Sequence, residues 1–245
     1  MQPMRLRWAL LMFGCVSCLA VRAGEEAPSG AEALKSAGIE LDVKKREVRV
    51  EATVCLSQGI LEYLICLPNT FEHEAIFSVR CKPSVLHLGL LAIGLEPCPI
   101  DAFGLWREKA RENPRARVSI GVEYETDGKK QRRRISELLV NRQKRDAAVP
   151  DDWVFTGSFF GKRADQRVYA ADVMGGVVGL GQEGASVLQF SEELGNPYQD
   201  DEQGLEVNTD TVPAKGTKVV LIFTPAPQKP QEQEKPEASK KEAER

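Results

Sequence analysis

The sequence predicts an α+β fold that is mainly antiparallel β, with one buried helix near residues 84–93. Segments in which apolar and polar residues alternate, as in half-buried strands, recur along most of the chain. Turn residues such as Ser57-Gln58-Gly59 and Asp127-Gly128 separate these segments at short intervals, which favours hairpins and antiparallel pairing. Only one segment has the apolar content expected of a buried helix. Strand-like segments therefore far outnumber helical ones.

The first 23 residues are typical of an export signal. Arg5 and Arg7 precede an apolar run from Trp8 to Val21, and Val21-Arg22-Ala23 places small residues at the two positions that signal peptidase reads. The apolar run is shorter than the roughly 20 residues of a membrane span. We therefore expect cleavage after residue 23 and a periplasmic or secreted protein. The alternative is membrane anchoring by an uncleaved signal or a lipidated cysteine.

The charge balance of the chain is acidic. It contains 33 Lys and Arg against 36 Asp and Glu, a net charge of −3, and loss of Arg5, Arg7 and Arg22 with the signal would make it −6. Nucleic-acid binding needs a basic surface that displaces phosphate counterions, so we expect no nucleic-acid partner. The sequence contains no second apolar stretch long enough to span a membrane after the signal.

The remaining chain divides into three parts. We expect a linker over residues 24–37, one folded domain over residues 38–225 and a tail over residues 226–245. The tail is rich in Pro, Gln, Glu and Lys and has no aromatic residue. Such a composition cannot bury enough apolar surface to offset the entropy of ordering, which predicts a disordered tail.

Three strands are expected in the first part of the domain. Glu47 to Val54 alternates with period two, and further strands are expected from Leu61 to Leu67 and from Ala75 to Val79. If they form a meander, Cys66 falls opposite a residue near Ala75. Cys81 then lies at the far end of its strand, beyond the roughly 7 Å between Cα atoms that a disulfide can bridge.

The helix follows these strands. Pro83 and Ser84 stand where a helix begins, the segment from Val85 to Ile93 is apolar on nearly every side, and Gly94 suits a helix end. We therefore expect this helix to be buried across the preceding sheet. The later strands are expected at residues 118–124, 131–135, 153–160, 169–180, 185–190, 205–208 and 219–223, the first two joined by the hairpin turn Asp127-Gly128.

Four cysteines follow the signal, and an export pathway would make disulfides possible for them. Four cysteines allow three pairings, and the sequence leaves the pairing open. No C-x-x-C occurs among them, so the tight local clamp of zinc ribbons is missing. The alternative is that they are buried free thiols. The residues in question are Cys55, Cys66, Cys81 and Cys98.

The middle of the chain resembles the YdjY-domain family of exported bacterial proteins. The resemblance rests on LEYLICLPNTFEHEAIFSVRCKPSVLHLGLLAIGLEP, and later on WVFTGSFF, YAADVMGGVVGL and LEVNTDTVPAKGTKVVLIFTP. It spans roughly Gly38 to Pro225. The most specific feature is His-Glu before a strand, followed by Lys-Pro-Ser-x-x-His opening an apolar helix. The resemblance implies an exported α+β domain without an assigned activity.

The only two histidines suggest a candidate metal site made of His73, Glu74 and His87. Imidazoles and a carboxylate can ligate a transition metal or transfer protons near pH 7. Adjacent strand residues point to opposite faces, however, so His73 and Glu74 cannot easily share one ligand sphere. The alternative, which we favour, is that His87 hydrogen-bonds a backbone carbonyl and that His73 and Glu74 cap a loop.

Two further motifs were weighed for binding. Lys129 to Arg134 forms the densest basic cluster, which could contact an anionic surface or could protect an exposed hairpin edge from aggregation. Gly179 to Gly184 spells G-x-G-x-x-G, but the strand-like residues that follow stand where the dinucleotide fingerprint needs a helix. We therefore expect no NAD.

Together these observations favour an exported, non-catalytic binding or scaffolding domain of the cell envelope, more probable on this sequence than an enzyme. Its partner would be an envelope protein or an anionic surface contacted through Lys129 to Arg134. We expect no cofactor. The alternative is a metal-binding or redox protein that uses His73, His87 and cysteine side chains.

Overall fold

The structure is a computed structural model that describes residues 34–101, 105–181, 184–195, 200 and 202–227. The expected signal over residues 1–23 and nearly all of the expected tail lie outside these residues. No helix in the described part of the chain is long and apolar enough to cross a membrane.

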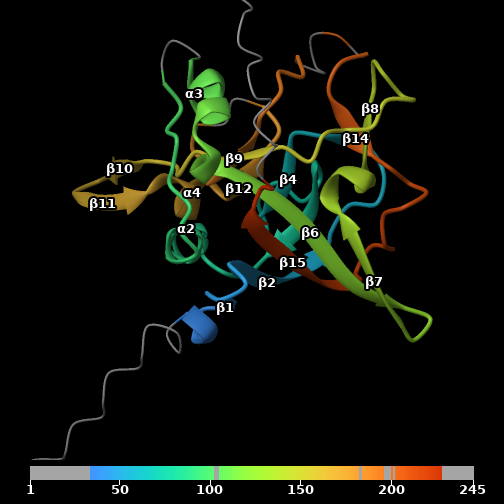
Figure 1. Cartoon of the computed structure of the whole chain (residues 1–245), viewed down its shortest axis with the longest axis horizontal. Helices are drawn as coiled ribbons and strands as arrows, with labels where there is room; N and C mark the ends of the chain where they lie inside the picture. Colours follow the sequence, from blue (N-terminus) through green and yellow to red (C-terminus); the bar gives the residue numbers. More distant parts are fainter. Residues whose placement is uncertain (1–33, 102–104, 182–183, 196–199, 201, 228–245) are drawn as a thin grey trace, which may run out of the picture.

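The domain is built around a closed barrel of eight strands, seen at the centre of Figure 1. Each strand pairs with the next, and pairing of β5 with β2, for example Ala52 with Val79, closes the ring. Six pairings are antiparallel, whereas β4–β5 and β12–β13 are parallel. In ring order the strands are β2 (Glu47–Val54), β15 (Lys218–Pro225), β6 (Arg117–Thr126), β9 (Trp153–Phe155), β13 (Leu188–Phe190), β12 (Gly176–Gly179), β4 (Tyr63–Cys66) and β5 (Ala75–Val79).

Smaller elements surround the barrel. β1 (Ile39–Asp42) extends the sheet beyond β2, and β7 (Lys129–Arg134) forms a hairpin with β6. β3 (Ile60–Leu61), β14 (Leu205–Val207) and β8 (Leu139–Asn141) form a separate sheet, and β10 (Phe160–Arg163) pairs with β11 (Gln166–Tyr169). The helices are α2 (Pro83–Ala92), α3 (Trp106–Glu112) and α4 (Ala170–Met174), with 3₁₀ turns η1 (Pro114–Ala116) and η2 (Ile135–Leu138).

The core fills the barrel with side chains from alternate strand positions. Along β2, Val48, Val50, Ala52 and Val54 are buried, as the period-two pattern predicted. The largest buried rings include Phe77, Trp153, Phe155, Phe190 and Phe223. Burial of one such side chain contributes about 1.5–3 kcal/mol, so the barrel holds most of the apolar stabilisation of the domain.

The predicted fold class was wrong in its architecture. The domain is a mostly β closed barrel with mixed pairing and several short helices, rather than an α+β fold with mainly antiparallel strands and one buried helix. Closure depends on β2 pairing with both β15 and β5, which are far apart in the sequence. The expected meander also fails, because β4 and β5 run parallel and Cys66 pairs with Ser78 instead of a residue near Ala75. Local periodicity reports strands but not their partners.

The helix also differs from its prediction. α2 buries Leu86 and Leu90 against the barrel, and Gly89 packs so closely that an added Cβ would lie 3.3 Å from a Val48 methyl. Its other side is open, with Leu88 57% and Leu91 42% exposed. The helix is therefore half-buried. A second helix, α4, occupies residues for which a strand was expected.

Candidate functional site

The predicted metal residues fall into two places. His73 is an exposed side chain whose Nε2 lies 3.7 Å from the Glu74 carboxylate, just before β5. His87 lies on α2 among Gly157, Tyr169 and Phe155. Within the described ranges, no group of three or more His, Cys, Asp or Glu side chains is placed to hold a metal ion. The metal site stays an untested hypothesis.

His87 is tied into the domain through one ring nitrogen. Its Nδ1 lies 3.0 Å from the Gly157 carbonyl and 2.8 Å from the Tyr169 hydroxyl, which itself donates to the same carbonyl at 2.7 Å. With the tyrosine proton on the carbonyl, Nδ1 must carry a proton to avoid facing two acceptors. Burial lowers the pKa of His87, and the carbonyl bond opposes that shift only in part. The ring is therefore a neutral structural group.

A charged hydrogen bond fixes α4 beside the start of α2. The Ser84 backbone N–H and hydroxyl donate to the two carboxylate oxygens of Asp172, at 2.8 and 2.6 Å. Hydrogen bonds to a carboxylate are stronger than neutral ones, and the negative charge also suits a helix N-terminus. Because Ser84, Leu88 and Leu91 share one stripe of α2, this bond places α4 next to the exposed leucines.

The turn before β10 is fixed by its backbone conformation and by a contact with α4. Gly157 has a φ of +84°, and a Cβ there would come within 2.8 Å of Pro97, so glycine is required. Ser158 also has a positive φ, of 54°. Its hydroxyl donates to the Ala185 carbonyl and accepts from the Ala171 N–H at 3.2 Å, which joins the turn to α4. This hydroxyl is occupied in holding the backbone.

These contacts gather exposed apolar side chains on one side of the barrel. Nine large hydrophobic residues in the described part of the chain are exposed, and six of them belong to α2, α4 or the start of β10. Figure 1 shows α2, α4 and the β10–β11 hairpin next to one another. We call this surface the apolar face; it consists of Leu88, Leu91, Phe159, Phe160, Val173 and Met174.

Cations border the apolar face. The Arg167 guanidinium lies 4.2 Å from the ring centre of Phe160, a cation–π contact. Lys162 and Arg163 are exposed on the same hairpin, and Lys82 is exposed at the start of α2. Among the residues that the structure describes, none of these four cations forms an ion pair, and the hairpin contains a single acid, Asp165.

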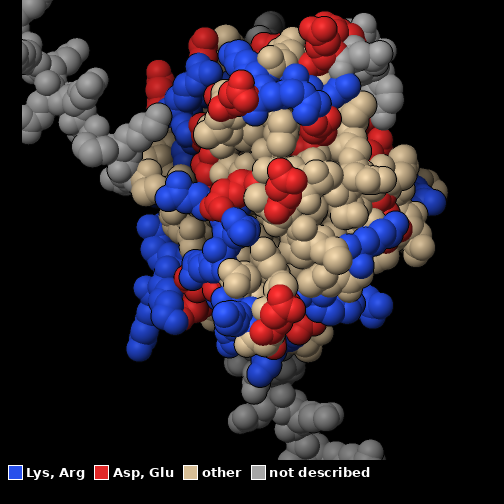
Figure 2. Space-filling view, turned by 90° about the vertical axis from the view of Figure 1, so that its right-hand side faces the viewer, with Lys and Arg blue, Asp and Glu red and all other residues tan. Residues whose placement is uncertain are grey.

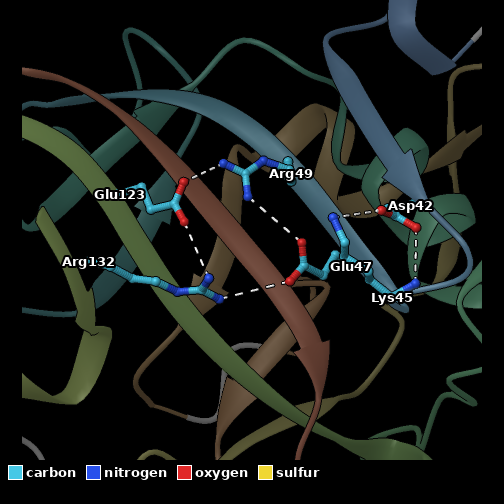
Figure 3. A network of polar contacts seen from close by, with 6 residues as sticks. All are labelled: Asp42, Lys45, Glu47, Arg49, Glu123 and Arg132. Carbon is cyan, nitrogen blue, oxygen red and sulfur yellow. Dashed lines mark hydrogen bonds and ion pairs between the residues drawn. The ribbon is translucent and has the colours of Figure 1, made fainter. Parts of the chain in front are cut away.

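The basic cluster of the sequence has a different environment. Arg132 on β7 approaches Glu123 at 3.4 Å and Glu47 at 3.9 Å, and Arg49 bridges the same two carboxylates (Figure 3). Arg133 pairs with Glu137 at 3.3 Å. Figure 2 shows acidic and basic side chains interleaved on the side of the molecule that carries β7 and β8. Two of the five cations of Lys129 to Arg134 are thus paired with carboxylates, and within the described residues Lys129, Lys130 and Arg134 form no ion pair. We call the surface formed by β7 with Glu47, Arg49, Glu123 and Glu137 the charged face.

The comparison with known families gives the chain its place. A family model of the YdjY domain matches residues 39–224, nearly the whole of the barrel. The chain belongs to the YdjY domain family. No curated protein and no solved structure gave a match.

Sequence reasoning missed the apolar face of this YdjY domain. The all-round apolar pattern of α2 was interpreted as burial on all sides, although a helix that packs against one barrel buries only one stripe. The sequence feature that could have indicated this face is Phe159-Phe160 next to Lys162 and Arg163. Two aromatic residues at the start of a short basic hairpin cannot both be buried in the core.

The four cysteines of this YdjY domain are all buried, and none of them forms a disulfide. Cys55 follows β2 and Cys66 ends β4, on either side of β5, and the Cys55 thiol donates to the Ala75 carbonyl at 3.0 Å. Cys81 packs near Gly38, and Cys98 lies in a small cluster with Trp106. The sequence left three pairings open, and the structure shows these four cysteines as free thiols.

Proposed function

We propose that this YdjY domain is an exported, non-catalytic binding domain that docks on an anionic membrane surface through the apolar face. The observation that carries the proposal is the coincidence of six exposed apolar side chains with four cations that form no ion pair in the described part of the structure. Apolar side chains with a basic border are the pattern of proteins that lie in the membrane interface.

The magnitudes fit reversible binding. Transfer of a Leu or Phe side chain from water to an apolar environment contributes about 1.5–3 kcal/mol. Each Lys or Arg held near an anionic leaflet adds about 1 kcal/mol. Insertion of only some of these side chains, with the bordering cations, is sufficient to offset the cost of association.

The local hydrogen bonds support a non-catalytic role. The Ser158 hydroxyl and His87 Nδ1, the two groups nearest to a catalytic arrangement, are used to hold the turn and α2 in place. A surface of exposed hydrophobic side chains is suited to contact rather than to bond making. The expected export signal would place this surface beside the membrane.

Vesicle sedimentation tests the proposal. The chain beginning at Gly24 retains every described element, and removes the apolar segment of the expected signal from the assay. We expect it to bind vesicles with phosphatidylglycerol more tightly than vesicles of phosphatidylcholine alone, with affinity falling as salt increases. The triple variant Leu88→Ser, Phe159→Ser, Phe160→Ser should lose at least about tenfold in affinity.

The matched control is Ile60→Ser, an exposed hydrophobic residue of β3 outside the apolar face. It should bind like the unchanged chain. Equal loss in the control and the triple variant would contradict the proposal, as would a lack of sedimentation with any vesicle. If the unchanged chain forms a dimer, binds no vesicles and becomes a monomer in the triple variant, the apolar face is an interface with a second copy. That result would overturn the proposal of membrane docking.

A further inference from the structure

We propose that a groove on the outer surface of the barrel binds an acidic sugar chain, that is, an oligosaccharide with repeated carboxylate groups. Two neighbouring hollows form this groove, which we call the basic groove. Binding there is independent of membrane docking, because none of the described residues that line the groove belongs to the apolar face.

The two hollows are similar in size and adjacent. The first, of about 320 Å³, lies between the turn before β2, η1 and the end of β15, and the second, of about 340 Å³, lies over β15, β6 and β7. Thr224 lines both hollows. Arg46 precedes β2 and Arg134 ends β7, and β15 and β6 lie between these two strands. Three strand spacings amount to about 14 Å, which suits an extended ligand better than a single small anion.

Cations dominate the lining of the basic groove. Each hollow contributes three, and Glu137 is the one acid among the described residues that line the groove. Within the described ranges, Arg46 and Arg134 form no ion pair. A ligand with anions at intervals along a chain matches this distribution. The six cations are Lys45, Arg46 and Arg115 in the first hollow and Arg132, Arg133 and Arg134 in the second.

The other four cations are paired with acids, but their pairs are open to solvent. The side chain of Lys45 is 70% exposed beside Asp42, and that of Arg115 is 63% exposed beside Glu96. Arg132 is 58% exposed in its contact with Glu123. Exposed ion pairs contribute little to stability, so a carboxylate of the ligand can replace one of the protein at little cost.

Arg46 is positioned in the first hollow by the end of α2. Its φ of 55° is in the left-handed region, which is uncommon for a residue other than glycine. Its Nε donates to the Ile93 carbonyl at 2.8 Å and its Nη2 to the Gly94 carbonyl at 3.4 Å. A Cβ at Gly94 would lie 3.2 Å from the same Nη2, so glycine allows this close approach. A guanidinium has five N–H groups, and three therefore remain for a carboxylate, whose two oxygens match its planar geometry.

The floor of the groove favours a sugar chain over a peptide. β15 is paired along one edge with β2 and along the other with β6, so its backbone cannot add a peptide strand. Gly121 lies opposite Ile222 and has no side chain to fill the second hollow. Thr224 supplies a hydroxyl where the hollows meet. Charged donors and a hydroxyl are the groups that bind the carboxylates and hydroxyls of an acidic sugar chain.

Calorimetric titration of the chain beginning at Gly24 tests the ligand class. We expect a galacturonate hexamer to bind, with affinity falling as salt increases, and the neutral maltohexaose not to bind. Galacturonate monomer should bind at least about tenfold more weakly, because it reaches one hollow only. A hexamer of glutamate should bind at least about fivefold more weakly. Lack of binding by the galacturonate hexamer would overturn the proposal, and equal or tighter binding of the glutamate hexamer would assign the groove to an acidic peptide.

Variants with one cation removed from each hollow test whether one chain spans both. Arg115→Gln and Arg134→Gln should each weaken binding of the galacturonate hexamer at least about threefold, and the double variant at least about tenfold. The matched control, Lys162→Gln with Arg167→Gln, removes two cations outside the groove and should bind within about twofold of the unchanged chain. Full affinity in either single variant would contradict a ligand that spans both hollows. Equal losses in the control and the double variant would reduce the binding to unspecific charge attraction and overturn the site.

A change of shape without a change of charge gives a second test. A Cβ at Gly121 would lie 3.6 Å from the Arg133 carbonyl oxygen, an ordinary contact, so Gly121→Val should fold and fill part of the second hollow. We expect it to weaken binding of the galacturonate hexamer at least about tenfold, and the triple variant of the apolar face to bind it like the unchanged chain. Full affinity in Gly121→Val would contradict the groove, as would loss in the triple variant. Should Gly121→Val fail to fold, the titrations of the unchanged chain still decide the proposal.

Discussion

The charged face and the apolar face use the same kinds of residue in opposite ways. On the charged face, Arg49 of β2 and Arg132 of β7 each reach the carboxylates of Glu47 and Glu123, which lie on β2 and β6 on either side of β15 (Figure 3). On the apolar face, Arg167 lies over Phe160 without an acid. The sequence alone does not show which cations the fold pairs with acids.

The energetics sharpen this difference. Exposed ion pairs contribute about 0–1 kcal/mol and are screened by salt, so the ion pairs of the charged face add little to stability. A leucine or phenylalanine that is about half exposed keeps the corresponding part of its transfer free energy available for a partner. The apolar face therefore has more free energy to gain from contact than the charged face has.

The largest expected effect comes from charges placed within the apolar face. Leu88→Asp combined with Phe160→Asp should weaken binding to phosphatidylglycerol vesicles at least about 100-fold, because two apolar transfers are lost and two anions approach the membrane. Both residues are more than half exposed, so the free energy of unfolding should change by less than about 0.5 kcal/mol. Urea unfolding checks that the fold is intact, and full binding by the folded variant would refute the apolar face.

Removal of cations from the two faces should give unequal results. Arg163→Gln with Arg167→Gln should cost about 2 kcal/mol of binding, or about 30-fold, at low salt. The matched pair on β7, Arg132→Gln with Arg133→Gln, removes two cations that are ion-paired and should reduce affinity by less than about threefold. Vesicle titrations at two salt concentrations measure both. A larger loss of affinity from the β7 pair would mean that the charged face, and not the apolar face, binds the vesicles.

A substitution of His87 tests how much its hydrogen bonds contribute to holding α2 in place. His87→Gln should lower the free energy of unfolding by about 1.5 kcal/mol at pH 7.5, because the Gly157 and Tyr169 hydrogen bonds become imperfect.

The pH dependence of the same variant has a defined sign. Burial lowers the pKa of His87 in the folded state below its unfolded value of about 6.5. The stabilisation that the neutral ring provides is therefore fully present above the unfolded pKa and is lost as the pH falls through the folded pKa. The stability difference between the unchanged chain and His87→Gln should therefore shrink between pH 7.5 and pH 5 in urea unfolding. A difference that grows on acidification would contradict a neutral buried ring.

The smallest expected effect is on the charged face. Glu123→Gln should cost less than about 1 kcal/mol of stability, because its partners are partly exposed. It also leaves Arg49 and Arg132 with fewer acids, and should therefore add a weak, salt-sensitive component to vesicle binding. If Glu123→Gln leaves vesicle binding unchanged at low salt, ion pairing is not the reason why the charged face does not bind vesicles.

Local elements were predictable from the sequence, and their assembly was not. The alternation of Glu47–Val54 and the Asp127-Gly128 turn predicted β2 and the β6–β7 hairpin because both signals are contained in a few residues. The segment from Ala170 to Met174 has 5 residues, too few to show the 3.6-residue period of a helix, and Asp172 in it binds Ser84 across 88 residues of chain.

The sites show the same limit. That the chain contains His73, Glu74 and His87 was visible in the sequence, but only the fold separates His87 from the other two. Likewise, the placement of Cys55 and Cys66 on the two sides of β5 is a property of barrel closure. No spacing of 11 residues predicts it.

Quenching by brominated phosphatidylglycerol tests most directly whether the apolar face is the surface that enters the membrane. Tryptophan is introduced on one face or the other, as Phe160→Trp or Lys130→Trp, in the chain beginning at Gly24. The native Trp106 and Trp153 are fully buried and give a constant background. We expect strong quenching of Phe160→Trp and none above background for Lys130→Trp. Quenching of Lys130→Trp alone would contradict the account and assign membrane contact to the charged face.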